Sequence, residues 1–311
     1  MASFINSVSS VLIILLLTAS GYFFGAKKWM RAEHKSFLEK YLMSFAFPCM
    51  CIDGFLNNLS SEILQDSWKT IALVIALVCI CAVLSALLAF MLRLPRNRIG
   101  VLICMGGFSN AIFVGYPMCV ELFGEGSVIY VMLFFLCSSI FVFVGGNAAL
   151  AWFTDTDKKF SRDRVVKVFL NPPILGAFAG LLMVIAGISL PRPLGGFIGY
   201  IKDTISPLAL FYCGFVIYEA GIKNIRFDRG MAAMMIIRFI MSPLICVLLC
   251  RLFNIPATES SILTVLSAMP VITILTVMVR EWDADVQYTA IGIVLSTLAC
   301  FIVIPVLLLV L

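Results

Sequence analysis

Two short stretches of the sequence place polar side chains beside residues that interrupt a helix. The first contains Gly106-Gly107-Phe108-Ser109-Asn110 followed by Gly115-Tyr116-Pro117, and the second contains Ser267-Ala268-Met269-Pro270. Glycine lowers the stability of a helix, and proline removes a backbone donor and clashes with the preceding turn. Each stretch therefore predicts a break, where backbone N–H groups and polar side chains are free to bind a small anion.

Asn110 is the strongest candidate for binding, because its amide supplies two donors and one acceptor and suits a carboxylate. Its alternative role is a structural cap that holds the break together. Hydroxyl groups in helices often bond back to their own backbone, which makes the hydroxyl residues weaker candidates. The predicted substrate-binding residues are Asn110, Ser109, Gly107, Pro117, Pro270, Met269, Ser267 and Thr273.

Three ionisable residues inside or near the ends of apolar stretches are candidates for balancing a substrate charge or for coupling to an ion. Such residues are costly in lipid and tend to be functional. Arg238 stands deep in its stretch, where it balances a substrate anion or pairs with an acid of the protein. Asp53 and Glu219 stand near the ends of theirs, so simple contact with water is the alternative for both.

The composition shows what surrounds these residues. Of the 311 residues, 62% are hydrophobic and 13% are charged, whereas an average soluble domain is about 45–50% apolar and about 25% charged. Most of the chain must therefore face lipid or pack inside a membrane domain. A transmembrane helix takes about 20 apolar residues. Ten stretches of about that length predict an all-α integral membrane protein: 4–24, 37–56, 70–92, 99–123, 127–153, 165–188, 194–220, 230–252, 261–279 and 286–311.

Lysine and arginine concentrate in alternate loops between these stretches. Cytoplasmic loops carry this excess, so the pattern predicts that the N- and C-termini both lie outside a plasma or inner membrane. Lys27, Lys28 and Arg31 follow the first stretch and no positive charge precedes it, which favours a retained span over a signal peptide. Four tryptophans at span ends are expected to anchor at the interface: Trp29, Trp68, Trp152 and Trp282.

The residues that would support other classes of protein are sparse. The eleven cysteines lie in apolar stretches without C-x-x-C spacing, and His34 is the single histidine. They predict small buried side chains and no metal or cofactor. An intramembrane enzyme would need paired aspartates, a Ser–His pair or a His-Glu-x-x-His motif, so an enzyme is not expected, and neither is nucleic-acid binding. A channel would favour a ring of polar residues, and a receptor or sensor bundle is a further alternative.

Residues recur at a spacing of about 160 positions between the two halves of the chain. Pro48 corresponds to Pro207, Glu121 to Glu281, and Asn110 to Pro270. If the halves are related, the odd number of spans in each gives them opposite orientations, as in carriers with inverted repeats. The expected division is 1–153 and 165–311, joined by a short cytoplasmic linker at 154–164, with spans four and nine broken at the matching positions.

Several motifs carry a resemblance that runs nearly end to end. They are GFSNAIFVGYPMCVELFG at 107–124, NPPILGAFAGLL at 171–182, SPLALFYCGFVI at 206–217, SAMPVITILTVMV at 267–279 and STLACFIVIP at 296–305. The sequence resembles the auxin efflux carrier family of membrane transporters, and its short central loop is similar to that of bacterial members. In that family, Asn110 matches the asparagine of the first crossover and Pro270 matches the proline of the second.

The resemblance implies a fold similar to sodium/proton antiporters and bile-acid symporters. Helices 1, 2, 6 and 7 would form a scaffold, and helices 3–5 and 8–10 would form a transport domain in which the broken helices 4 and 9 cross. It implies a homodimeric carrier of a small organic anion, such as a carboxylate or auxin-like acid, by elevator or rocking motion. Coupling to protons or sodium is open, and a neutral or amino-acid substrate is the alternative.

Overall fold

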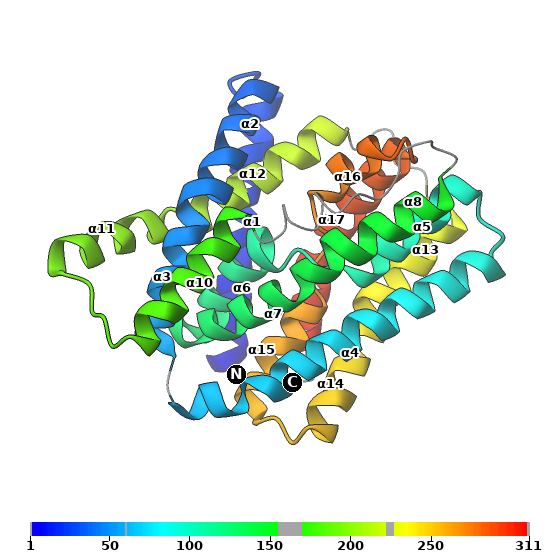
Figure 1. Cartoon of the computed structure of the whole chain (residues 1–311). Helices are drawn as coiled ribbons and strands as arrows, with labels where there is room; N and C mark the ends of the chain where they lie inside the picture. Colours follow the sequence, from blue (N-terminus) through cyan, green and yellow to red (C-terminus); the bar gives the residue numbers. More distant parts are fainter. Residues whose placement is uncertain (1, 60, 155–169, 222–226, 310–311) are drawn as a thin grey trace.

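The structure, a computed structural model, describes residues 2–59, 61–154, 170–221 and 227–309, and every regular element among them is helical (Figure 1). Most of the predicted linker 154–164 and the first part of the stretch 165–188 lie outside the described residues. The elements are α1 (Ala2–Ala26), α2 (Ala32–Tyr41), η1 (Leu42–Ala46), α3 (Phe47–Asn58), α4 (Ser61–Met91), α5 (Arg96–Gly107), η2 (Ala111–Gly115), α6 (Tyr116–Phe123), η3 (Glu125–Ser127), α7 (Val128–Ile140), η4 (Phe141–Gly146), α8 (Asn147–Phe153), α10 (Pro172–Ile185), α11 (Arg192–Asp203), α12 (Ile205–Ala220), α13 (Arg229–Ile236), η6 (Ile237–Met241), α14 (Ser242–Leu252), α15 (Ala257–Ser267), α16 (Leu275–Glu281) and α17 (Val286–Leu308).

Six helical stretches of the described chain are long and apolar enough to cross a membrane. They support six of the ten predicted spans and the integral membrane class. The six are Ser9–Ala26, Asp66–Met91, Glu125–Phe153, Arg192–Ala220, Arg229–Leu252 and Val286–Leu308. Two shorter apolar helices, Ala111–Phe123 and Pro172–Ile185, fall within further predicted spans. The full set of ten spans stays a prediction.

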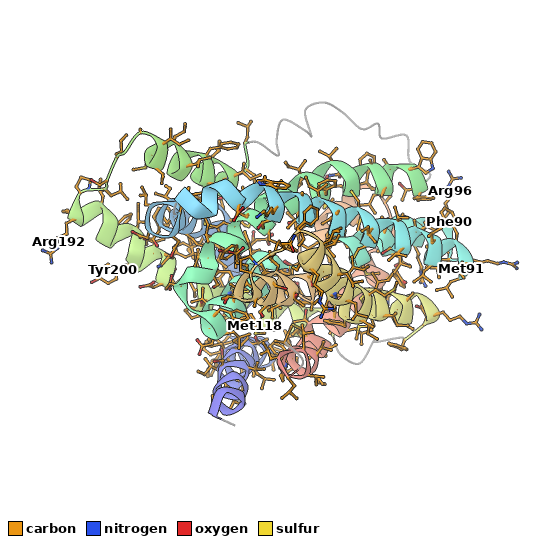
Figure 2. The ribbon with its side chains drawn as sticks, turned by 90° about the horizontal axis from the view of Figure 1, so that it is seen from below. Phe90, Met91, Arg96, Met118, Arg192 and Tyr200 are labelled. Carbon is orange, nitrogen blue, oxygen red and sulfur yellow. The ribbon has the colours of Figure 1, made fainter. Side chains whose placement is uncertain are left out.

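The outer surface of the bundle is apolar, as contact with lipid requires. Large apolar side chains such as Leu87 on α4, Leu248 on α14 and Ile302 on α17 are more than half exposed. Figure 2 shows Tyr200 pointing outward at one extremity of the molecule and Met91 at another. In water such a surface would cause aggregation, so it indicates a lipid environment.

Helix packing joins elements that are distant in the sequence. The helix α1 packs along α12, and α3 packs against α10 and α11. The contact between α1 and α12 is close because it is made by Gly21 and Gly214, where a Cβ atom would collide with the facing backbone. Small residues commonly allow such approach in membranes. Elsewhere α4 packs on α5, α7 and α14, and α15 packs on α7 and α14.

Three of the π-helical turns precede a proline. The turns η1, η2 and η6 end just before Pro48, Pro117 and Pro243, respectively. Proline lacks an N–H, so the carbonyl four residues earlier loses its helical partner, and a wider turn lets the chain find other donors. In η1 the Phe47 N–H accordingly donates to the Leu42 carbonyl, five residues back.

The tryptophan prediction was wrong at one position of four. Trp29, Trp68 and Trp152 are exposed, as interface anchors must be, but Trp282 is fully buried. Its Nε1 donates to Asn147 Oδ1 at 2.7 Å. The turn after α16 folds inward and gives the indole a polar partner, which a buried tryptophan requires. The cysteine prediction holds for most positions, since nine of the eleven are buried.

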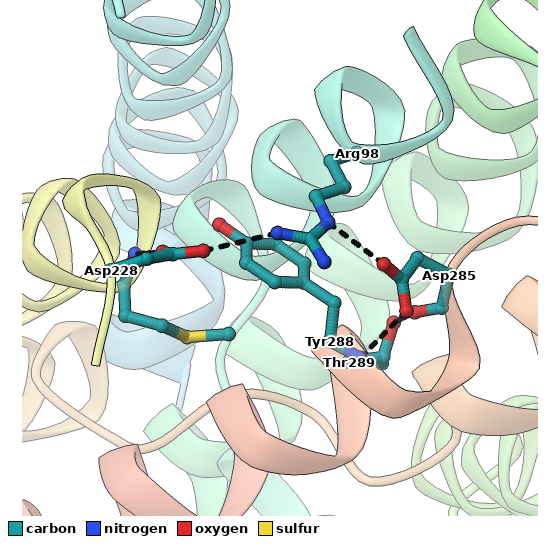
Figure 3. A network of polar contacts seen from close by, with 6 residues as sticks. Arg98, Asp228, Asp285, Tyr288 and Thr289 are labelled. Carbon is teal, nitrogen blue, oxygen red and sulfur yellow. Dashed lines mark hydrogen bonds and ion pairs between the residues drawn. The ribbon is translucent and has the colours of Figure 1, made fainter. Parts of the chain in front are cut away.

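A polar cluster ties together the first turns of three helices (Figure 3). Arg98 on α5 donates to Asp285 at 2.7 Å and to Asp228 at 3.1 Å, and its guanidinium lies over the Tyr288 ring. Asp228 and Asp285 also accept backbone hydrogen bonds as the N-caps of α13 and α17. One arginine therefore joins two capped helix ends to a third helix.

Candidate functional site

The two predicted breaks are present and lie against each other. The first separates α5 from η2, and the second separates α15 from α16. Ser109 and Val271 form an antiparallel bridge, and the Asn110 N–H donates to the Pro270 carbonyl at 2.8 Å. The Val271 N–H donates to Ser296 Oγ at 3.0 Å. Backbone that leaves a helix inside a membrane needs such partners. Here the second break supplies one to the first, and α17 supplies one to the second.

Asn110 is both a cap and an unsatisfied donor. Its Oδ1 accepts from the Phe113 N–H at 3.2 Å and so caps η2. This bond fixes the orientation of the amide and directs Nδ2 elsewhere. The side chain is 2% exposed, and Nδ2 has no hydrogen-bond partner among the described residues. A buried donor without a partner costs about 1–3 kcal/mol, and a bound acceptor would remove that cost.

Both breaks line one recess with about 580 Å³ of empty space. Ser109 and Asn110 come from the first break, and Thr273 comes from the second. The helices α2 and α7, the turns η1, η2 and η4, and Asn171 complete the wall. Apolar side chains dominate the lining, and a few polar groups converge on it, which is the usual character of a small-molecule site. We call this the recess.

The remaining predicted binding residues surround the recess without lining it. Gly107, Pro117, Met269 and Pro270 are buried around the breaks. The Ser267 hydroxyl donates back to the Thr264 carbonyl at 2.6 Å.

The three ionisable candidates do not line the recess either. Asp53 pairs with Lys202 at 3.1 Å, and Glu219 pairs with Lys35. Arg238 is 1% exposed in η6, and its Nε and Nη2 have no hydrogen-bond partner among the described residues. Burying a charge without a partner is costly, and π-helical turns often mark functional positions.

Sequence reasoning missed four polar residues of the recess: Glu39, Ser138, Ser139 and Asn171. Ser138 and Ser139 form a serine pair inside an otherwise apolar stretch, and Asn171 begins the NPPILGAFAGLL motif, so these three had a local signal. Glu39 had none, because it stands beside Lys40 near the beginning of the predicted span 37–56, where a charged side chain commonly reaches water.

A second, more polar cavity adjoins the recess. This cleft has about 1170 Å³ of empty space between α2 and α12 on one side and α16 and α17 on the other. Lys35, Glu219 and Arg280 line it. Glu39 lines both the cleft and the recess, so the two cavities meet at its side chain.

Comparison with known proteins identifies the family. A family model described as membrane transport protein matches residues 6–308. An uncharacterized transporter of Methanocaldococcus jannaschii is 27% identical over 94% of this chain and 95% of its own length. An uncharacterized transporter of Methanothermobacter thermautotrophicus is 22% identical over 97% of each chain. These matches point to a transporter rather than an enzyme. The chain therefore belongs to the membrane transport protein family, which confirms its resemblance to the auxin efflux carriers.

Proposed function

We propose that the protein is a secondary carrier for a small organic anion and binds the carboxylate of that anion where the two helix breaks meet. The observation that carries the proposal is the buried, unpartnered Nδ2 of Asn110, a residue that lines the recess. A hydrogen bond from this amide to a carboxylate is charge-assisted and therefore stronger than a neutral one.

Other groups at the breaks suit the same anion. The backbone N–H groups of Thr273 and Ile274 have no hydrogen-bond partner among the described residues, and both residues line the recess. The helix formed by η2 and α6 begins at Ala111, so the positive end of its dipole lies at the recess. Phe113, Phe135 and Phe143 offer apolar walls to the rest of the substrate.

The proposal includes ten spans arranged as two inverted halves of five. A pair of matching contacts supports it. Arg98 of α5 contacts Tyr288 of α17, and Glu259 of α15 accepts a hydrogen bond from Tyr130 of α7 at 2.8 Å. Each of these residues is the third of its helix. The fourth helix of each half thus begins against the fifth helix of the other half, as inversion requires.

The helix contacts are in keeping with a scaffold and a transport domain. The scaffold would contain α1, the continuous α2–η1–α3, α10, α11 and α12, among which α1 packs on α12 and α3 on α10. The transport domain would contain α4 to α8 and α13 to α17, which the Arg98 cluster and the α4 contacts tie together. The cleft separates the two groups and the recess opens toward it, so a solute would leave or enter there.

An ion-pair contact joins the same two groups far from the cleft. Lys202 of α11 contacts Asp53 of α3 at 3.1 Å and Glu125 of η3 at 3.0 Å. Lys35 and Asp53 lie on one continuous helix, and at about 1.5 Å per residue they are roughly 27 Å apart. In alternating access, each of the two conformations is open on one side of the membrane and closed on the other. A cleft near Lys35 and a contact between the two groups near Asp53 fit one of these conformations.

The test is uptake of organic acids into proteoliposomes by wild type and two Asn110 variants. Asn110→Asp keeps an oxygen for capping Phe113 and removes the amide donor, whereas Asn110→Ala removes both. A hydrogen bond to a charged group contributes about 1.5–3 kcal/mol, and about 1.4 kcal/mol is tenfold in affinity. We therefore expect at least a tenfold weaker apparent affinity for the acid in both variants, with thermal stability kept in Asn110→Asp.

The control variant is Ser267→Ala. Ser267 lies beside the second break, but its hydroxyl donates to a carbonyl of its own helix and does not face the recess. Uptake by this variant should match wild type. Undiminished uptake by a folded Asn110→Asp variant would remove the amide from the site. Failure of every organic acid to bind or move would remove the proposed function.

A further inference from the structure

Glu39 stands at the junction of the two cavities. It lies near the end of α2, next to the π-helical turn η1, and it is half-buried. The Tyr212 hydroxyl donates to Glu39 Oε2 at 3.2 Å. Tyr212 in turn stacks on Phe113, which is the residue capped by Asn110. The carboxylate is thus held by a tyrosine that packs on the first break.

Among the described residues no basic side chain forms an ion pair with this carboxylate, although Lys35 and Arg280 line the cleft on its other side. The recess has no lysine, arginine or histidine among its described lining residues. Lys35 lies one turn before Glu39 but contacts Glu219. Within the described chain, Glu39 has a hydrogen bond from a neutral phenol and no ion pair. A negative charge at the wall of a cavity favours a cation within it.

We infer that the carried acid also bears an ammonium group, which pairs with Glu39 while its carboxylate is held by Asn110. This inference rests on the proposed carboxylate site, but it changes the net charge of the substrate: an anion is replaced by a zwitterion, an amino acid with an apolar side chain. Glu39 is the one ionisable residue among the described lining of the recess. A simple monocarboxylate would therefore bring a second negative charge beside it. A zwitterion instead meets an acceptor for its ammonium and a donor for its carboxylate.

The recess also suits the side chain of such a substrate. Phe113, Phe135 and Phe143 line it together with isoleucine and valine side chains. These walls would bury an apolar side chain and offer little to a second charged group.

The test compares acids that differ only in the ammonium group. The pairs are L-phenylalanine with 3-phenylpropionate and L-leucine with 4-methylpentanoate, measured as uptake into proteoliposomes. Wild type should prefer the amino acid of each pair at least tenfold. Glu39→Gln, which keeps an oxygen for Tyr212, should lose that preference and gain uptake of the monocarboxylate. The control is Glu33→Gln, an exposed acid on the same helix, which should behave as wild type.

The outcomes separate this inference from the function on which it rests. Equal uptake of both members of each pair by wild type overturns the ammonium assignment and leaves the carrier standing. A preference that survives in Glu39→Gln also overturns it, as does a variant that loses only a dependence on sodium or pH. If Glu39→Gln fails to fold, Glu39→Asp should keep the preference at lower affinity. Failure of all four acids, and of every other organic acid, removes the carrier function itself.

Discussion

Arg238 and Asn110 share an unusual condition, since both are buried and both have nitrogen atoms without a partner in the described chain. Replacing buried charged groups with apolar residues of similar volume is often neutral or stabilising, by about 1–4 kcal/mol in known cases. We expect Arg238→Met to melt at the same or a higher temperature than wild type in detergent, and to transport more slowly. The reason is that a buried charge that lowers the stability of the folded protein tends to be retained for function.

The control for Arg238→Met is Arg98→Met. Arg98 has two carboxylate partners, so its removal should lower the melting temperature. A lower melting temperature for Arg238→Met as well would show that its guanidinium is satisfied in the folded protein. Unchanged transport would show that the charge has no part in the cycle.

At the scale of elements, the contact between Lys202 and Glu125 holds η3 against α11. Glu125→Gln removes this contact and leaves the pair of Lys202 with Asp53 in place. Partly exposed ion pairs contribute about 0.2–1 kcal/mol, and about 1 kcal/mol shifts a two-state equilibrium about fivefold. We expect Glu125→Gln to favour the state with a closed cleft. A cysteine at Thr276, in the cleft, should then react more slowly with an impermeant maleimide, by up to about fivefold.

The labelling is done with Cys79→Ser, because Cys79 is the exposed native cysteine of the described chain. Asp66→Asn is the matched control, since it breaks an ion pair within the single helix α4. Its labelling rate should equal that of the parent. Equal rates for Glu125→Gln and Asp66→Asn would mean that the Lys202 contact does not distinguish two states.

At the scale of the whole molecule, the orientation of the ten spans can be measured directly. In Figure 1 the helix α1 begins and α17 ends on the same side, as an even number of spans requires. With the protein in a bacterial inner membrane, alkaline phosphatase fused to the C-terminus should be active and green fluorescent protein there should be dark. Fusions after Thr154 should give the opposite results. The same result at both positions would contradict five spans in each half.

The sequence determined the features that depend on a residue and its near neighbours. Proline and glycine at Gly107, Pro117 and Pro270 predicted both breaks, because a missing N–H or side chain acts within one helical turn. Apolar stretches and motifs likewise predicted the membrane class and the family, which the family match confirms. The amide of Asn110 and its place at a break predict a binding residue, and the structure places Asn110 in the wall of the recess.

Tertiary structure alone decided which distant groups meet. Nothing near Glu39 in the sequence predicts that it joins the recess to the cleft, and nothing near Trp282 predicts its bond to Asn147. The bond from Asn110 to Pro270 likewise joins breaks that are far apart in the chain. Such contacts depend on how helices pack. Packing is set by the summed shapes of many side chains, and no single stretch of sequence contains that sum.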